Sequence, residues 1–244
     1  MKNMVAVITG GSSGIGAAIV DRFAKNGAEV LSLDLLKPEK TIPGVIYIDC
    51  DITNEDSVVK AFDFIYETHP LIDVLCANAG IVPSWARIQD TSIQDWERVI
   101  DINVNGLFLT MKHAAKSLRP HMGKVVVTGS LNSWKGDPNI AAYVASKHAA
   151  LGIIKSAAID LGARGIRVNG VAPGPVATPA LIARIENRLQ EGTESLDQYL
   201  EKIASQTFLG RIATVDDVVN TIEFLSTEKS SGITGQLIHV DCGV

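Results

Sequence analysis

Short runs of β-branched and other apolar residues alternate along this chain with stretches of helical periodicity, and this alternation is the strongest constraint on its fold. The apolar runs lie at residues 5–8, 30–33, 45–48, 74–76, 124–128, 166–171 and 236–240. Helical periodicity covers about 15–26, 54–68, 92–118, 140–163 and 215–226. Continuous apolar runs suit strands that are buried on both faces. The sequence therefore predicts a doubly wound α/β fold, with a mostly parallel sheet of about seven strands and helices on both faces.

Two segments carry local signals within this pattern. The Thr53 hydroxyl is predicted to cap the helix that follows it, because Asp56 stands three residues on and an apolar stripe comes next. The segment at about 179–208 is charged and helix-prone, and it follows Pro-Gly-Pro at 173–175. We expect one domain over residues 1–244, with 179–208 as a lid or substrate loop.

Composition narrows the class of protein. Apolar residues make up 46% and charged residues 20%, and the net charge of −5 gives no electrostatic reason to expect a nucleic-acid partner. The first apolar run is too short for a signal peptide or membrane span, and the five histidines show no metal-ligand spacing. Cys50, Cys76 and Cys242 are scattered, as reduced thiols are. We expect a cytoplasmic protein with no metal, nucleic-acid or membrane partner.

A glycine-rich turn separates the first predicted strand from the first predicted helix. Residues 9–16 read Thr-Gly-Gly-Ser-Ser-Gly-Ile-Gly. Gly10 permits a sharp turn, while Gly14 and Gly16 remove side chains, so a diphosphate can approach the helix N-terminus. The spacing Gly-x-x-x-Gly-x-Gly differs from the usual Gly-x-Gly-x-x-Gly, and a tight turn without a ligand is the alternative.

Asp34 strengthens the case for a dinucleotide. It ends the second predicted strand, about twenty residues after the glycine turn, where an acid can accept hydrogen bonds from both adenosine ribose hydroxyls. A 2′-phosphate there would meet a like charge, so the sequence predicts NAD rather than NADP. The alternative is a solvated acid at a strand end.

Tyr143, Lys147 and Ser130 form a candidate proton-transfer site. Tyr143 and Lys147 are four residues apart in a predicted helix and therefore share one face. A neighbouring ammonium favours the phenolate and lowers the pKa of a phenol, which suits proton exchange with an alcohol or a carbonyl oxygen. Ser130 follows the predicted strand 124–128 and can hydrogen-bond the same oxygen. Each feature alone is common, and their order on the expected elements makes the signal specific.

With these motifs, the chain resembles the short-chain dehydrogenase/reductase family, in its compact single-domain, Rossmann-like form, over essentially its whole length. Residues 9–16 match the family's Thr-Gly-x-x-x-Gly-Ile-Gly, and 78–80 match its Asn-Ala-Gly. Asn103, Ser130, Tyr143 and Lys147 match its catalytic residues, and 173–178 match its Pro-Gly-x-Val-x-Thr.

The resemblance implies a mechanism. Tyr143 would be the general acid/base, Lys147 would lower its pKa and hold the nicotinamide ribose, Ser130 would polarise the substrate oxygen, and Asn103 would hold a water in a proton relay. The implied cofactor contacts are Gly10, Ser12, Ser13, Gly14, Ile15, Gly16, Asp34, Asp51, Ile52, Asn78, Ala79, Gly80, Tyr143, Lys147, Pro173, Gly174, Val176 and Thr178. The family also implies a homo-oligomer, usually a tetramer.

Two positions depart from the family pattern. Gly129 replaces the serine often found before the catalytic serine, and Cys242 stands where the family commonly has glycine, in Asp-Cys-Gly at 241–243. The C-terminal strand usually lies at a subunit interface near the site, so Cys242 bears on local packing there.

The substrate pocket is predicted from residues beside the catalytic ones. Asn132 and Trp134 closely follow Ser130, so that with Ser130 and Tyr143 they would contact the substrate. Asn offers donors and an acceptor for hydroxyls, and Trp offers a broad apolar wall; packing of the loops is the alternative for Trp. The full set of candidate lining residues is Pro83, Ser84, Trp85, Leu131, Asn132, Trp134, Ala180 and Leu181.

The function expected from the sequence is NAD-dependent hydride transfer between a small-molecule secondary alcohol and its ketone. A mixed wall suits a polyol, a sugar-like alcohol or a hydroxylated ring. A cis-dihydrodiol dehydrogenase and a 3-oxoacyl thioester reductase are the alternatives among enzymes, and Asp34 disfavours the second because such reductases more often use NADP. A non-enzymatic NAD-binding module is the alternative from another class, and turnover with any alcohol would exclude it.

Overall fold

Seven parallel strands form one sheet in the computed structural model, which describes residues 1–189 and 195–244. Their order is β3-β2-β1-β4-β5-β6-β7, and each neighbouring pair is parallel. The strands are β1 (Val5–Thr9), β2 (Glu29–Asp34), β3 (Ile46–Asp49), β4 (Val74–Ala77), β5 (Lys124–Thr128), β6 (Arg167–Pro173) and β7 (Leu237–Val240). The predicted doubly wound fold is confirmed. The strand order reverses direction between β1 and β4, and such a switch point opens a crevice at the carboxyl ends of the strands.

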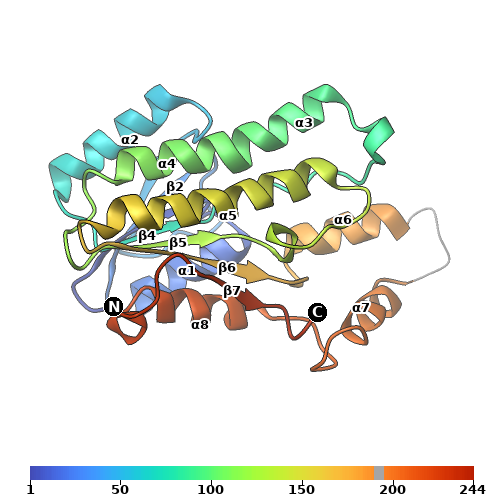
Figure 1. Cartoon of the computed structure of the whole chain (residues 1–244). Coiled ribbons are helices and arrows are strands. Elements are labelled where there is room, and N and C mark those ends of the chain that lie inside the picture. The colour runs from blue at the N-terminus through green and yellow to red at the C-terminus, as the bar shows by residue number, and fades with distance from the viewer. Residues whose placement is uncertain (190–194) are drawn as a thin grey trace.

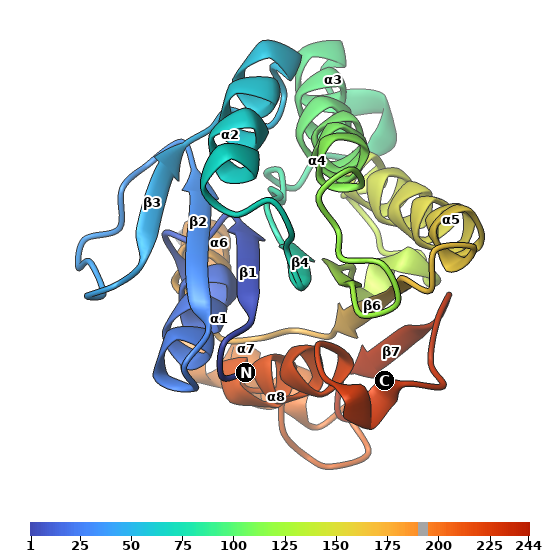
Figure 2. The ribbon, with the colours of Figure 1, turned by 90° about the vertical axis from the view of Figure 1, so that its left-hand side faces the viewer.

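Helices cover both faces of this sheet. Figures 1 and 2 show α2, α4 and α5 on one face and α1 and α8 on the other. The helices are α1 (Gly14–Lys25), α2 (Glu55–Thr68), α3 (Ile93–Ile100), α4 (Gly106–Ala114), α5 (Ala141–Gly162), α6 (Pro179–Leu189), α7 (Leu196–Ala204) and α8 (Val215–Leu225). Among the described residues, none of the helices is long and apolar enough to cross a membrane.

Each central strand is buried on both sides, which explains its continuous apolar sequence. In β1, Val7 packs in the cluster under α2, α4 and α5, whereas Ala6 and Ile8 pack in the cluster under α1 and α8. Phe62 of α2 belongs to the first cluster and Phe23 of α1 to the second. Successive residues of a strand point to opposite faces, so a two-sided core requires apolar residues throughout.

The stretch 92–118, predicted as one helical region, contains two helices separated by a π-helical turn. Helix α3 ends at Ile100, the turn η2 covers Asp101–Asn105, and α4 begins at Gly106. A π-turn inserts an extra residue into the helix and is common at functional sites. Here it contains Asn103.

The predicted start of α2 is wrong by one residue. Asn54, not Thr53, is the N-cap, because the Asn54 side chain accepts a hydrogen bond from the backbone N–H of Ser57 at 3.2 Å. The Thr53 hydroxyl instead donates to the Asp51 carboxylate at 2.7 Å. Both side chains are good caps, and the nearby carboxylate decides between them.

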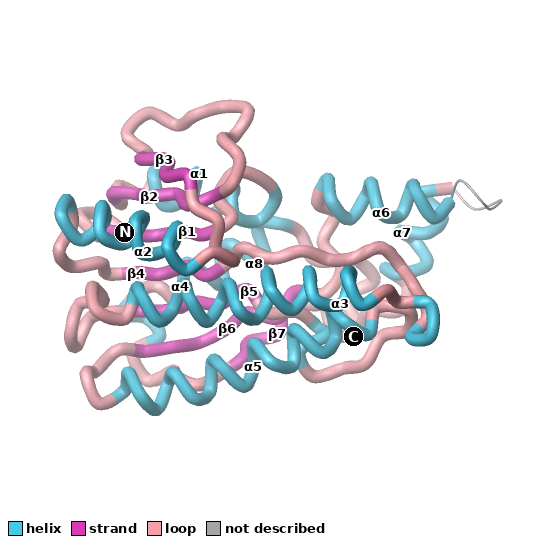
Figure 3. The backbone as a smooth tube through the Cα atoms, turned by 90° about the horizontal axis from the view of Figure 1, so that it is seen from above, coloured by secondary structure: helices cyan, strands magenta, loops and turns pink. Residues whose placement is uncertain are grey.

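The predicted lid segment 179–208 contains α6 and α7. These two helices lie beyond the carboxyl ends of the strands (Figures 1 and 3). A capping box in which the Ser195 and Gln198 side chains bond each other's backbone N–H groups starts α7. Residues 190–194 of the predicted lid lie outside the described part of the chain.

Candidate active site

A cavity of about 1370 Å³ lies at the carboxyl ends of the strands. The glycine turn, the loops after β2 to β6, the start of α5 and the lid helices all contribute to its walls. Predicted residues that line it are Gly10, Ser13, Gly14, Ile15, Asp34, Asp51, Ile52, Asn78, Ala79, Gly80, Pro83, Ser84, Trp85, Ser130, Leu131, Asn132, Tyr143, Lys147, Pro173, Gly174, Val176, Thr178, Ala180 and Leu181. Ser12, Gly16, Asn103 and Trp134 are not among the described lining residues.

The glycine turn leaves room at the N-terminus of α1. A side chain at Gly16 would place its Cβ 1.9 Å from the carbonyl oxygen of Gly10, and one at Gly10 would reach 2.7 Å from the Cα of Ala79. At Gly14, by contrast, an added Cβ would come no closer than 4.0 Å to a neighbour, the Cγ2 of Thr178, and this glycine lines the cavity. Helix α1 has no acidic residue in its first turn, and Ser13 makes no side-chain cap. Free backbone N–H groups at a helix N-terminus suit an anionic diphosphate, so these residues fit a dinucleotide.

Asp34 is held in place by backbone donors. Its carboxylate accepts hydrogen bonds from the Ser12 N–H at 3.0 Å and the Leu36 N–H at 3.1 Å. The Ser12 hydroxyl in turn donates to the backbone oxygen of Leu36. Ser12 therefore contacts Asp34 and its loop rather than the cavity. The fixed carboxylate fits a ribose with free hydroxyl groups.

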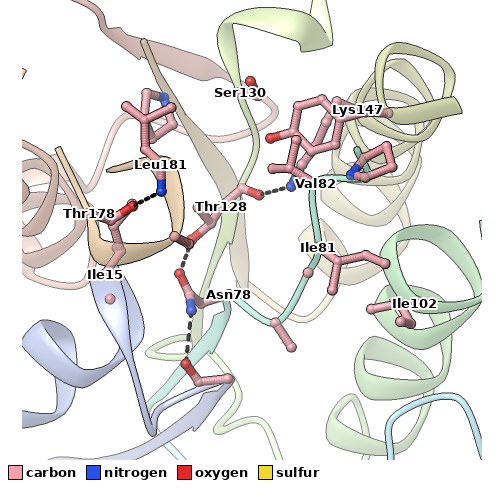
Figure 4. A pocket seen from close by; sticks show the side chains of 18 of the residues that line it. Ile15, Asn78, Ile81, Val82, Ile102, Thr128, Ser130, Lys147, Thr178 and Leu181 are labelled. Carbon is pink, nitrogen blue, oxygen red and sulfur yellow. Dashed lines mark hydrogen bonds between the residues drawn. The ribbon is translucent and has the colours of Figure 1, made fainter. Parts of the chain in front are cut away.

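A row of hydrogen bonds crosses the floor of the cavity between neighbouring strand ends (Figure 4). The Thr9 hydroxyl accepts from the N–H of Asn78 at 3.1 Å and from that of Ala79 at 3.2 Å. The Asn78 side chain donates to the Gly10 oxygen at 3.2 Å and accepts from the Thr128 hydroxyl at 3.0 Å. Asn78 thus joins the glycine turn to β5, and its amide is occupied within the protein.

Tyr143 and Lys147 lie together at the start of α5, as predicted. The Lys147 ammonium is 5.6 Å from the centroid of the Tyr143 ring and donates to the Thr128 oxygen at 2.8 Å. Figure 4 shows Lys147 and Ser130 facing the same space. The sequence reasoning missed Thr128, whose backbone oxygen orients Lys147. Its place at the end of β5, two residues before Ser130, was the available signal.

Asn103 is buried, and both ends of its side-chain amide are occupied. Its oxygen accepts from the Ile81 N–H at 2.8 Å, and its nitrogen donates to the Ile81 oxygen at 2.9 Å and to the Ser146 hydroxyl at 3.0 Å. Ser146, fully buried, donates to the backbone oxygen of Tyr143 at 2.8 Å. Asn103 thus ties the loop after β4 to the catalytic helix. Ser146 was missed, although its place directly before Lys147 in the motif pointed to it.

Ser130 begins a short 3₁₀ turn, η3 (Leu131–Ser133). Its hydroxyl accepts from the Asn132 N–H at 3.1 Å, and its own N–H donates to the Ser133 hydroxyl. Trp134 ends the turn and stacks on His239 of β7, with ring centroids 5.0 Å apart and ring planes 4° from parallel. Asn132 is therefore in the cavity wall, whereas Trp134 packs against the edge strand.

The two buried thiols and the possible metal ligands among the described residues do not form a second reactive site. Burial raises the pKa of the Cys50 thiol to about 11 and that of Cys76 to about 12, so both are unreactive near neutrality. Within the described ranges, no three His, Cys, Asp or Glu residues are grouped so as to hold a metal ion.

Similarity to known proteins agrees with this site. A family profile described as "Enoyl-(Acyl carrier protein) reductase" matches residues 10–244. "Short-chain dehydrogenase reductase 3a" of Arabidopsis thaliana is 36% identical over 100% of this chain and 95% of its own length. The chain belongs to the short-chain dehydrogenase/reductase family. "(+)-Borneol dehydrogenase 2" of Salvia officinalis is 36% identical over 98% of this chain and 88% of its own.

A solved structure of "NAD+-Bound Xylitol Dehydrogenase" superposes with a TM-score of 0.89, at 26% identity, over 99% of both chains. As a member of the short-chain dehydrogenase/reductase family, the protein is an oxidoreductase that acts on a secondary alcohol or its ketone with a nicotinamide cofactor.

Proposed function

We propose that the protein is an NAD-dependent dehydrogenase of a polyol, sugar-like or hydroxylated cyclic secondary alcohol, able to run in either direction. One observation carries the proposal: Ser130, Tyr143 and Lys147 line the same cavity as Asp34 and the glycine turn. A single ligand-sized space therefore joins a proton-transfer group to a ribose-binding carboxylate. NAD supplies the chemistry of accepting a hydride from the alcohol carbon and returning it.

Tyr143 is the general base in oxidation and the general acid in reduction. In oxidation, the phenolate oxygen of Tyr143 takes the hydroxyl proton of the alcohol as the carbonyl forms. Ser130 donates a hydrogen bond to the substrate oxygen. The Lys147 ammonium stabilises the phenolate form of Tyr143, which accepts the proton in oxidation and is left after proton donation in reduction, and it would bind the nicotinamide ribose. Ser130 and Tyr143 thereby also orient the substrate.

Asn103 supports this proton transfer mainly by position. Because both atoms of its amide are bonded to Ile81 and Ser146, a relay water would have to bind the Asn103 backbone oxygen instead. The π-helical turn supports that arrangement, since its irregular hydrogen bonding alters which carbonyls are free.

The contacts expected from the sequence would hold the cofactor along the cavity floor. The first turn of α1, with Gly14 and Ile15, would hold the diphosphate; Asp51 and Ile52 would contact the adenine; and Val176 and Thr178 would bind the carboxamide. Gly16 would contribute by close packing and Ser12 through Asp34. Within a single domain, α6 and α7 of the predicted lid would cover the substrate.

Asp34 selects NAD over NADP, and a substitution tests this. NAD⁺ and NADP⁺ are compared by NADH or NADPH formation for the parent, Asp34→Asn and Asp34→Ser. The parent is expected to prefer NAD⁺ by at least about a hundredfold, because a 2′-phosphate would meet the fixed carboxylate. Asp34→Asn, which keeps the shape and loses the charge, should lower the preference about tenfold or more. A parent preference for NADP⁺ would overturn this assignment.

A 3-oxoacyl thioester reductase is the second candidate, because a solved "3-ketoacyl-(acyl-carrier-protein) reductase" from Brucella melitensis superposes with a TM-score of 0.85 at 25% identity. Oxidation of NADH by an acetoacetyl thioester faster than by any cyclic ketone would favour it. NADH formation from a panel of cis-dihydrodiols tests the remaining alternative, a cis-dihydrodiol dehydrogenase.

We also propose that the protein is a homotetramer, as the family resemblance implies. A cytoplasmic location is proposed from the scattered cysteines. Size-exclusion chromatography with light scattering tests the assembly, and a monomer at micromolar concentration would contradict it.

A further inference from the structure

The Asn132 side chain is buried in the cavity wall with poorly satisfied hydrogen-bonding groups. Its exposed fraction is 7%, yet its amide nitrogen reaches the Lys135 oxygen only at 3.4 Å and its amide oxygen reaches the Ser130 hydroxyl only at 3.5 Å. Good hydrogen bonds of these kinds are about 2.7–3.2 Å long. Buried amides normally have close partners, so an amide without them beside a cavity points to a ligand.

The proposed reaction would also change the contact between Ser130 and Asn132. The Ser130 hydroxyl has one proton, with the Asn132 amide oxygen 3.5 Å from the hydroxyl oxygen, and the hydroxyl oxygen accepts from the Asn132 N–H at 3.1 Å. In the proposed reaction the Ser130 hydroxyl donates this proton in a hydrogen bond to the oxygen of the reacting carbon. The Asn132 amide oxygen would then lose the one donor that the described residues bring near it. A second donor, brought by the substrate, would satisfy it.

We propose that Asn132 binds a second hydroxyl group, on the carbon next to the reacting one, so that the substrate is a vicinal diol. The inference rests on the proposed function. Asn132 is two residues from Ser130 in one rigid turn, so a group that it binds must be close to the oxygen held by Ser130. A hydroxyl both donates and accepts, and it can therefore pair with the amide oxygen and the amide nitrogen. Adjacent carbons place two hydroxyl groups at this short separation.

The surrounding wall strengthens the preference for a single additional hydroxyl. Leu131, Ile140, Leu181 and Ile185 also line the cavity, and Ile140 and Ile185 are buried. Apolar walls offer the diol carbons a surface but give its hydroxyl groups no partner. Polar residues such as Gln94 and Asp137 also line the cavity, but Asn132 is the polar lining residue that shares the turn of Ser130, so we assign the discrimination between a diol and a simple alcohol to it.

The experiment compares cyclohexane-1,2-diols with cyclohexanol, in the parent and in Asn132→Leu. Leu keeps the branched shape of Asn with a somewhat larger side chain, and it forms no hydrogen bonds. The control is Trp134→Phe, which perturbs the same loop outside the cavity and keeps an aromatic ring against His239. Rates of NADH formation are measured for the cis and trans diols, and binding to the enzyme–NADH complex is measured by calorimetry.

The parent should oxidise one diol with a kcat/KM at least about tenfold above that of cyclohexanol, as expected for one well-placed hydrogen bond. Asn132→Leu should lower kcat/KM for the diol about tenfold more than kcat/KM for cyclohexanol, so that the preference for the diol disappears, whereas Trp134→Phe should keep the preference. Equal losses for diol and cyclohexanol would mean that Asn132 only positions Ser130, which overturns the inference. Equal treatment of diol and cyclohexanol by the parent, in both turnover and binding, also overturns it.

The binding measurement separates this inference from the proposed function. Tighter binding of the diol that is lost in Asn132→Leu, without turnover of either alcohol, would support the subsite and contradict the proposed reaction. Turnover of cyclohexanol without any advantage for the diol would support the reaction and overturn the subsite.

Discussion

The two sides of the cavity are built differently. On the catalytic side, α5, η2 and the strand ends hold Asn103, Ser146 and Lys147 in buried positions, each with hydrogen bonds to neighbouring elements. On the lid side, no residue of α7, all of which is described, is buried, and Ile185 of α6 is buried against the cavity. We therefore expect the catalytic side to fix the geometry of the reaction and the lid side to affect mainly the binding of the substrate.

The largest effect is expected from substitution of Gly16, which lies outside the lid, in the glycine turn at the start of α1. Gly16→Ala would force a Cβ to 1.9 Å from the Gly10 oxygen, and the glycine turn would have to move away from the diphosphate site. We expect NADH binding, followed by fluorescence, to weaken by about a hundredfold or more.

Gly152→Ala is the matched control for that experiment. Gly152 lies within α5 with no atom within 4 Å of an added Cβ. Alanine there should raise the free energy of unfolding by about 0.5–1 kcal/mol and leave NADH binding unchanged. Normal NADH affinity in Gly16→Ala would show that the turn is not the diphosphate site.

Loss of the Ser146 hydroxyl should weaken catalysis without weakening binding. Ser146→Ala removes one partner of Asn103 and the hydrogen bond to the backbone oxygen of Tyr143, so the loop after β4 and helix α5 are held less firmly. We expect kcat to fall about tenfold, with the KM for NAD⁺ within about twofold and a displaced pH profile of kcat. A fall in thermal stability with unchanged kcat and pH profile would reduce Ser146 to a packing residue.

A lid substitution should do the reverse. Leu181→Ala shortens a half-buried side chain in the cavity wall at the start of α6. The KM for the alcohol should rise about threefold to tenfold, while NADH affinity stays the same. A larger effect on NADH affinity than on the KM for the alcohol would show that Leu181 contacts the cofactor. It would contradict the claim that lid residues affect mainly the binding of the substrate.

The smallest expected effect tests the sheet that supports both sides. Burial raises the pKa of Cys76 from 9.0 to about 12, so above pH 9 the unfolded chain loses a proton that the folded chain keeps. The free energy of unfolding must therefore fall as pH rises through this range. Cys76→Ala should be less stable at pH 8 but show a shallower fall, by about 1 kcal/mol, between pH 8.5 and pH 10 in urea titrations. An unchanged slope would show that the thiol ionises equally in both states.

The sequence predicted what depends on local chemistry. Strands buried on both faces need continuous apolar runs, and the turn at Gly16 tolerates no side chain. The strands and the glycine turn can therefore be recognised from the sequence alone. Tyr143 and Lys147 were predicted to share a helix face, and they do.

Other features depend on contacts that are distant in sequence. Asn54 rather than Thr53 caps α2 because Asp51 engages Thr53. In the π-turn, the Asn103 side chain accepts a hydrogen bond from the N–H of Ile81, which is 22 positions away. Local periodicity cannot reveal such a contact. Trp134 was predicted to contact substrate, but its partner His239 comes from the far end of the chain.

The most direct test of the central claim is the activity of Tyr143→Phe on the alcohol that the parent oxidises best. Phenylalanine keeps the ring beside Lys147 and removes only the phenolic oxygen. The account predicts that kcat/KM falls by about a thousandfold or more, with NADH affinity and thermal stability close to those of the parent. Full activity in Tyr143→Phe would contradict the assignment of Tyr143 as the general acid/base.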